Sequence, residues 1–260
     1  MSEIVVSVCM PAHNAEKTIL RAVDSALAQD VPLEVVIVDD AGTDGTGALI
    51  REKYGNEKRV RLLVNEKNQG ASGSRNRAVR EARGRYVAFL DSDDWWAEGK
   101  LKKQLSRLRG TDASLCCTGR ELITPDGKKT GRVIGVPAKI TYKKLLTSNY
   151  INCSSVLMER EKALEFPMEH EECHEDYLTW LKVLKKYGPA AGIDEPLLCY
   201  RLTSAGKSGS KLHSASMTYR TYRAAGFSRA RSALCFALYT VNGLLKYGKA
   251  AVKPFAKASR

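Results

Sequence analysis

Apolar, β-branched segments alternate with helix-like segments along the N-terminal part of the chain. Residues 4–10 and 33–40 are rich in valine and isoleucine, and the segment between them repeats apolar side chains at helical spacing. Residues 59–64, 72–83 and 85–90 continue the pattern as strand, helix and strand. This alternation predicts an α/β fold in which a mostly parallel central sheet is covered by helices on both faces.

Each of the four predicted strands runs into a polar segment. In sheets of this kind, ligands bind beyond the carboxyl ends of the strands. The polar segments here are residues 11–14, 39–46, 65–78 and 91–94. Each one alone has an ordinary structural explanation, such as a helix cap or a turn. Four of them at the same edge of one sheet predict a ligand site.

The sequence excludes two common classes of nucleotide-binding protein, the dinucleotide-binding domains and the proteins with a GxxxxGK[ST] phosphate-binding loop. A dinucleotide-binding domain needs a glycine-rich turn after that strand, where the pyrophosphate meets a helix N-terminus. Residues 11–18 contain no glycine, and the chain has no GxxxxGK[ST] phosphate-binding loop. The phosphates of a nucleotide would therefore have to be bound in another way.

Paired carboxylates after the fourth strand suggest that the phosphates are bound through a divalent metal ion. Asp91 and Asp93 are two residues apart on a segment that we expect to be extended, so their side chains should point the same way. Magnesium and manganese take oxygen ligands, usually one or two carboxylates plus the phosphates of the substrate. The alternative is an acidic helix N-terminus, which suits Asp94 better than the other two. We therefore predict that Asp91 and Asp93 bind Mn²⁺ or Mg²⁺.

The composition is that of an ordinary globular protein, with 43% hydrophobic and 27% charged residues among 260. No apolar run approaches the roughly 20 residues of a membrane-spanning helix, and no secretion signal is present, so we expect a cytoplasmic protein. The seven cysteines include no CxxC pair, which favours buried thiols. His170, Cys173 and His174 could ligate zinc, but a closed zinc site needs four ligands and no second cluster accompanies them.

Positive charge is concentrated at the C-terminal end. The net charge is +13, and residues 196–260 hold 12 Lys or Arg and no acid, so the preceding body is nearly neutral. A nearly neutral body with a basic end indicates an anchored enzyme more than a nucleic-acid-binding protein.

Residues 228–260 also carry an apolar pattern. Six side chains fall on one helical stripe with Arg and Lys on its flanks: Leu234, Ala237, Leu238, Val241, Leu244 and Leu245. The 14 uncharged residues 232–245 are too few to cross a bilayer but can lie in its surface. The alternatives are a helix that packs back on the enzyme or one that forms a homodimer.

Four segments together resemble family 2 of the inverting glycosyltransferases: VSVCMPAHNAEKTILRAVDSALAQ, LEVVIVDDAGTDGT, NQGASGSRNRA and YVAFLDSDDWW. The resemblance is close over residues 4–110 and continues at 174–188 and 199–210. It implies the A-type glycosyltransferase fold, a Rossmann-like nucleotide-sugar domain, with a UDP-sugar as donor substrate.

The resemblance also implies which residues bind the donor and its metal. The donor-binding residues are Pro11, His13, Asp39, Asp40, Arg75, Asp91 and Ser92. His13 stands where the family commonly has tyrosine, and an imidazole can also stack on a base. Arg75 is expected to turn toward the base or the diphosphate, and Asp93 to be the direct metal ligand. Relatives often have a metal-binding histidine near position 203, where this chain has threonine, so Arg201 or Lys207 is expected to meet the diphosphate.

An inverting transfer also needs a base, because the acceptor hydroxyl must lose its proton as it attacks the anomeric carbon. Glu175 and Asp176 begin an amphipathic helix, where an acidic first turn would be the structural explanation. The resemblance implies that Asp176 is the catalytic base, and that Glu175 orients it or binds the acceptor.

We therefore predict a catalytic domain over residues 1–212, divided into a nucleotide-binding half (1–110) and an acceptor-binding half (111–212), and a basic amphipathic helical tail over 213–260. The predicted reaction moves a hexose or N-acetylhexosamine from a UDP-sugar to a saccharide acceptor, expected to be lipid-linked, in bacterial polysaccharide synthesis at the inner face of the plasma membrane. No nucleic acid is expected as a partner.

Two alternatives from other classes stay open. A metal-dependent nucleotidyltransferase of related fold would release pyrophosphate instead of UDP. A basic nucleic-acid-binding protein would bind DNA or RNA with a steep dependence on salt.

Overall fold

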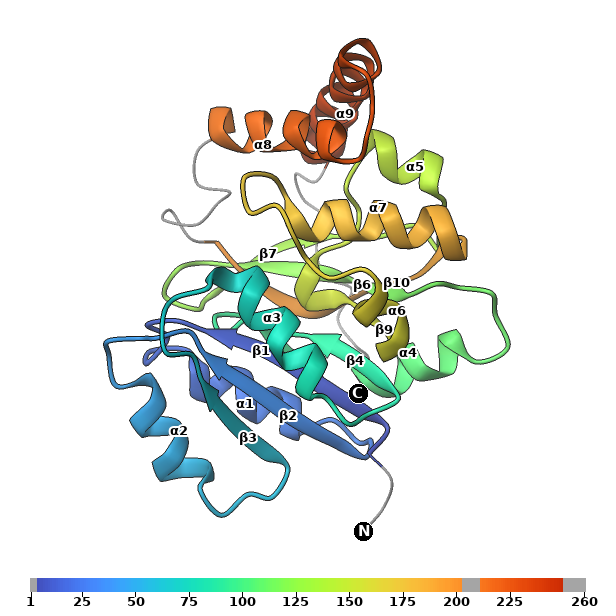
Figure 1. Cartoon of the computed structure of the whole chain (residues 1–260). Helices are drawn as coiled ribbons and strands as arrows, with labels where there is room; N and C mark the ends of the chain where they lie inside the picture. Colours follow the sequence, from blue (N-terminus) through green and yellow to red (C-terminus); the bar gives the residue numbers. More distant parts are fainter. Residues whose placement is uncertain (1–3, 203–210, 250–260) are drawn as a thin grey trace.

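The computed structural model describes residues 4–202 and 211–249 (Figure 1). Its N-terminal half alternates strands and helices as the sequence predicts. In chain order the elements are β1 (Val6–Ala12), α1 (Ile19–Leu27), β2 (Leu33–Asp39), α2 (Thr46–Tyr54), β3 (Val60–Val64), α3 (Gly70–Glu81) and β4 (Tyr86–Phe89).

These four strands pair in parallel, in the spatial order β3-β2-β1-β4. Successive side chains of β1 point to opposite faces of the sheet. Val8 and Met10 share a core with Ile19 of α1, whereas Cys9 shares the other core with Ala78 of α3. Helices therefore cover both faces, which confirms the predicted architecture.

The C-terminal half adds strands of mixed direction and further helices. Its elements are β5 (Trp95–Trp96), α4 (Lys100–Leu108), β6 (Cys116–Ile123), β7 (Lys129–Ile134), β8 (Lys139–Ile140), α5 (Tyr142–Thr147), a 3₁₀ turn (Cys153–Ser155), β9 (Leu157–Glu159), α6 (Arg160–Glu165), α7 (Glu175–Tyr187), β10 (Ala190–Arg201), α8 (Lys211–Ala224) and α9 (Arg229–Lys249). β9 runs antiparallel between β4 and β6, and β10 runs parallel to β6. Within the described residues the strands form one ten-stranded sheet.

Helix α7 joins the sheet to the C-terminal helices. Its residues Tyr177, Leu181 and Leu184 are buried at the helical spacing that the sequence predicts. The hydroxyl of Tyr177 donates a hydrogen bond to the carbonyl oxygen of Leu145 in α5 (2.7 Å) and lies 3.1 Å from the hydroxyl of Tyr222 in α8. Figure 1 shows α8 and α9 beyond α7, on the side away from β1, β2 and β3.

The predicted apolar stripe of the tail is on the outside of α9. Leu234, Leu238 and Leu244 are 61%, 44% and 73% exposed, and the side chain of Leu245 lies outside the described part. Contact with the body is made by the opposite face of the helix. No described helix has the length and apolar character needed to span a membrane. All seven cysteines are buried thiols, as expected.

Candidate functional site

A cavity of about 230 Å³ lies at the carboxyl ends of the parallel strands. Its lining comes from the end of β1, the segments after β2 and β4, and the first turns of α3: Pro11, Ala12, His13, Asp40, Ala71, Arg75, Asp91, Ser92 and Asp93. Six of the seven predicted donor-binding residues and both predicted metal ligands are among them. The structure therefore brings together residues that are up to 82 positions apart in the chain.

Asp40 is held in place by hydrogen bonds to its Oδ1. The side-chain amide of Asn65 donates one (2.6 Å) and the backbone N–H of Gln69 donates another (2.8 Å). Next to it, Nδ1 of His13 lies 2.9 Å from the carbonyl oxygen of Asp40. A carbonyl oxygen can only accept, so this bond requires the proton of the imidazole to be on Nδ1. The carboxylate and the imidazole thus face the cavity in fixed orientations.

Asp39 is the predicted donor-binding residue that does not line the cavity. Its Oδ1 accepts a hydrogen bond from the backbone N–H of Gly42 (3.0 Å), and a side chain on Gly42 would meet that oxygen at 2.9 Å. Asp39 therefore shapes the loop after β2 and leaves the cavity wall to Asp40. The sequence could not separate the two adjacent aspartates.

The carboxylates after β4 lie in a turn, because β4 ends at Phe89. Our expectation of an extended segment was wrong: the backbone N–H of Asp94 donates to the carbonyl oxygen of Asp91 (3.1 Å) and closes the turn. Asp91 and Asp93 nevertheless both line the cavity. Asp94 does not cap a helix, since its Oδ1 accepts from the backbone N–H of Arg201 (2.8 Å) and α4 begins only at Lys100.

The two tryptophans after this turn fix its position. Trp95 and Trp96 form β5, which pairs with β10. The indole N–H of Trp96 donates to the carbonyl oxygen of Ser154 (2.7 Å), while the hydroxyl oxygen of Ser154 accepts from the backbone N–H of Asp91 (3.1 Å). The guanidinium of Arg21 stacks on Trp95, 3.3 Å from the ring centroid. These contacts explain why the acidic segment continues into two large aromatic residues.

Negative charge accumulates in this turn. Burial, and then the nearby carboxylate of Asp91, raise the pKa of Asp93 to about 6. Burial and the neighbouring carboxylates raise the pKa of Asp94 well above its ordinary value. Because crowded carboxylates destabilise one another, a cation between them would relieve the repulsion. The two cavity-lining carboxylates fit a divalent cation whose remaining ligands are water and phosphate, and the described residues contain no cluster of three or more side chains that would complete a site.

Arg75 connects this turn to helix α7. It is only 6% exposed, and its Nη2 donates to Oδ1 of Asp91 (2.6 Å) while its Nη1 donates to Oε1 of Glu175 (3.2 Å). The sequence predicted that Arg75 would reach toward the base or the diphosphate. In the structure it lines the cavity, but its guanidinium is bonded to two carboxylates from distant parts of the chain.

Glu175 and Asp176 are the first two residues of α7. Glu175 is buried against Arg75, and Asp176 is mostly buried, with its Oδ1 accepting from the backbone N–H of Tyr177 (2.7 Å). Burial, and next the charge of Glu175, raise the pKa of Asp176 to about 6. A carboxylate with this pKa is ionised at neutral pH and is a stronger base than an ordinary aspartate.

Glu171, which the sequence analysis did not single out, lies at the N-terminus of α3, beside the cavity-lining residue Ala71. Its Oε1 accepts from the backbone N–H of Ser72 (3.3 Å) at the N-terminus of α3. Gly70 has a positive φ of 74°, and a side chain there would collide with the Glu171 carboxylate. A loop carboxylate placed by such a long-range contact leaves no pattern in the sequence.

Other predicted contacts near the site can be placed as well. The Nε of Arg201 donates to the carbonyl oxygen of Asp93 (2.8 Å), so the guanidinium supports the acidic turn. Thr203 and Lys207 lie outside the described residues. The residues weighed for zinc have separate partners: His170 pairs with Glu172, and Nε2 of His174 lies 3.2 Å from the carbonyl oxygen of Ser214.

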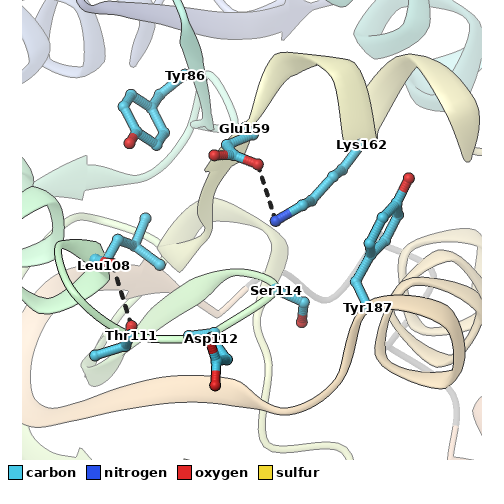
Figure 2. Close-up of a pocket in the computed structure, with 9 residues that line it drawn as sticks. Tyr86, Leu108, Thr111, Asp112, Ser114, Glu159, Lys162 and Tyr187 are labelled. Atoms are coloured by element: carbon cyan, nitrogen blue, oxygen red, sulfur yellow. Dashed lines mark hydrogen bonds and ion pairs between the residues drawn. The ribbon is translucent and has the colours of Figure 1, made fainter.

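Figure 2 shows a second cavity, of about 290 Å³, which includes Tyr86 at the amino end of β4. None of the residues that the sequence singles out lines it. Its amine, Lys162, is paired with Glu159 at 2.9 Å and lies 5.2 Å from the ring centroid of Tyr187. The lysine and the glutamate of this cavity thus satisfy each other.

Comparisons with known proteins show what the whole chain is similar to. Residues 7–166 match the family model described as Glycosyl transferase family 2. The chain is 36% identical over 243 residues to TuaG of Bacillus subtilis (strain 168), named as a teichuronic acid biosynthesis glycosyltransferase, covering 93% of this chain and 96% of the relative. It is 37% identical over 216 residues to the Escherichia coli UDP-Glc:alpha-D-GlcNAc-diphosphoundecaprenol beta-1,3-glucosyltransferase WfgD, covering 81% and 82%.

A solved structure supports the same fold. The crystal structure of S. aureus TarS 1-349 in complex with UDP-GlcNAc superposes with a TM-score of 0.68 at 21% identity, covering 93% of this chain and 73% of that one. At this identity the likeness concerns the fold alone.

Proposed function

The chain belongs to glycosyl transferase family 2, and from that membership we propose that it moves a hexose or N-acetylhexosamine from a UDP-sugar to a lipid-linked saccharide, with inversion at the anomeric carbon. One observation carries the proposal. The cavity at the strand ends gathers six predicted donor-binding residues, and Arg75 links its acidic turn to the Glu175–Asp176 pair.

The uridine would occupy the part of the cavity lined by Pro11, His13 and Asp40. A carboxylate is the natural acceptor for the N3 hydrogen of uracil, and the bonds from Asn65 and Gln69 preorganise Asp40 for it. The His13 imidazole, oriented through the carbonyl oxygen of Asp40, offers a flat face for the base.

The diphosphate would lie toward Ser92 and the acidic turn. Asp91 and Asp93 would hold a divalent cation there, and that cation would supply stabilisation of the charge that develops on the leaving diphosphate. Arg75 holds the Asp91 side chain in place, so the negative charge of the turn keeps a fixed position. This division leaves the nucleotide to residues 1–110, from which all lining residues come.

Asp176 would accept the proton of the attacking hydroxyl. Its raised pKa of about 6 suits a base that works near neutral pH. Glu175 would orient it, because the buried ion pair with Arg75 fixes the first turn of α7. One displacement by the acceptor inverts the centre, so an α-linked donor would give a β-linked product.

The acceptor would bind on the side of residues 111–212. The name of WfgD gives that protein a glucosyl donor, UDP-Glc, and a diphosphoundecaprenol-linked GlcNAc acceptor. TuaG is named for teichuronic acid biosynthesis. These relatives favour a lipid-linked intermediate of a bacterial surface polysaccharide as the acceptor class for this chain.

A screen of UDP-sugars tests the proposal. Purified protein, Mn²⁺ or Mg²⁺, a lipid-linked saccharide and each UDP-sugar in turn are incubated, and the released nucleotide is measured. We expect UDP from at least one donor, a strong loss in Asp176→Asn and little change in Asp112→Asn, an exposed aspartate of the second cavity. Release of pyrophosphate would instead identify a nucleotidyltransferase, and salt-sensitive binding of DNA or RNA without any nucleotide release would favour the nucleic-acid alternative.

A further inference from the structure

The outer face of α9 is apolar and solvent-exposed. Seven large hydrophobic side chains are exposed in the described part of the chain, and four of them belong to this helix: Leu234, Leu238, Val241 and Leu244. They recur every three or four residues, so they form one stripe. Isolated exposed leucines are ordinary on protein surfaces, whereas a continuous stripe indicates a binding surface.

The position of this face is fixed by the other side of the helix. Ser232 and Cys235 are buried, and the ring of Tyr239 lies 6.0 Å from that of Tyr177 in α7. The side-chain amide of Asn242 donates to the carbonyl oxygen of Thr147 in α5 (3.1 Å). Because α9 is already packed on the body through these residues, its leucine stripe is left facing outward.

The charge of the C-terminal segment that contains the stripe indicates the kind of partner. Residues 196–260 hold 12 Lys or Arg and no acid, and Arg229 and Arg231 at the start of α9 are exposed. A symmetric dimer through this face would bring like charges together, since a two-fold interface pairs a patch with itself. An anionic lipid surface offers both an apolar layer for the leucines and negative head groups for the bases.

We propose that the outer face of α9 binds the surface of an anionic membrane, with the helix lying in the plane of the interface. This goes beyond the proposed reaction and does not depend on it. The same block of helices also contacts the catalytic segment, because the hydroxyl oxygen of Thr221 in α8 accepts from the backbone N–H of His174, just before α7 (3.2 Å). A membrane at α9 would therefore hold the Asp176 end of α7 in a fixed orientation to the lipid.

Vesicle co-sedimentation of the full chain tests the proposal. The probes are vesicles of pure phosphatidylcholine and vesicles that contain about 30% phosphatidylglycerol, so that roughly one lipid in three is anionic. The chain should bind the anionic vesicles, and salt should weaken that binding. The double variant Leu238→Glu, Leu244→Glu should bind about 100-fold more weakly, because it removes apolar contacts and adds repulsion at exposed positions. The matched control is Leu164→Glu, on α6 and 40% exposed, which should bind like the parent.

Three results would overturn the proposal. The parent chain could ignore the anionic vesicles, or the double variant could bind them as well as the parent. Analytical ultracentrifugation could show a dimer that the double variant dissociates, in which case the stripe is a contact between copies of the chain. Circular dichroism of each variant verifies that the helices are retained, and none of these measurements requires a functioning sugar transfer.

Discussion

Replacing Asp176 by asparagine should make the protein more stable at neutral pH while it removes catalysis. Burial, followed by the charge of Glu175, raises the pKa of Asp176 from 3.8 to about 6 in the folded protein. A difference of about two pKa units corresponds to about 3 kcal/mol. The ionised form of Asp176 thus lowers the free energy of unfolding by about that amount at about pH 8, where it is fully charged in both states.

The direction of the pH dependence follows from the raised pKa. The folded protein binds the Asp176 proton more tightly than the unfolded chain does. The stabilisation that this bound proton provides is therefore fully present below about pH 4 and is lost as the pH rises through about 6. Asparagine carries no charge and keeps an oxygen that can accept from the N–H of Tyr177. Its stability advantage should therefore be smaller at about pH 5 than at about pH 8, where it should reach about 3 kcal/mol.

Urea unfolding followed by circular dichroism at about pH 5 and about pH 8 measures this advantage, with Asp112→Asn as the exposed control. In parallel, transfer by the parent protein should rise as the pH increases through about 6, and the variant should transfer about 10²–10⁴-fold more slowly. A variant that is no more stable than the parent at the higher pH would refute the electrostatic reasoning. A variant that transfers sugar at the parent rate would exclude Asp176 as the base, and Glu175 would be tested next.

Three further changes test other parts of the site and its support. Asp93→Asn should lower transfer on the order of 10²-fold or more without unfolding the protein, and full activity of the parent in EDTA would contradict the metal assignment. Arg75→Met should lower the free energy of unfolding by about 3–5 kcal/mol in urea, because it leaves two carboxylates without their partner; a loss below about 1 kcal/mol would show that the ion pairs contribute little. Tyr177→Phe should lower the free energy of unfolding by about 1–2 kcal/mol, because the carbonyl oxygen of Leu145 and the hydroxyl of Tyr222 each lose one hydrogen-bond partner. Sugar transfer should be unchanged, and a variant as stable as the parent would contradict the assigned role of these bonds.

The strand ends of the N-terminal half were predictable because their signal is local. Buried parallel strands such as β1 and β2 are runs of apolar residues that short windows of sequence reveal. Polar residues just after such strands must meet at one edge of the sheet. The sequence alone therefore predicts a common site for Pro11, Asp40 and Asp93, and all three line one cavity.

Contacts between distant segments were not predictable in this way. Nothing in the sequence near Arg75 indicates that its guanidinium will be shared between Asp91 and Glu175, 16 and 100 residues away. The choice between Asp39 and Asp40 depends on a one-residue difference in where the loop turns. The hydrogen bond from the backbone N–H of Ser72 in α3 to the carboxylate of Glu171 is likewise a long-range contact.

For the C-terminal tail, too, the local sequence predicted the helix but not its contacts with distant segments. The periodicity of residues 228–260 predicted a helix with an apolar stripe, and α9 has one. The opposite face also carries apolar residues, among them Cys235 and Tyr239. Periodicity could not decide which of the two faces meets the body, because that depends on the surfaces of α5 and α8.

The division of the site into a nucleotide side and a base side is tested most directly by measuring UDP affinity and sugar transfer in the same pair of variants. Isothermal titration calorimetry with UDP and Mn²⁺ gives the affinity, and UDP release with a saccharide acceptor gives the transfer rate. Asp40→Ala should weaken UDP binding about 10-fold or more, since it removes a preorganised acceptor for the base. Asp176→Asn should bind UDP like the parent and transfer almost no sugar. If Asp176→Asn lost UDP binding while Asp40→Ala kept it, the two sides of the site would be assigned wrongly.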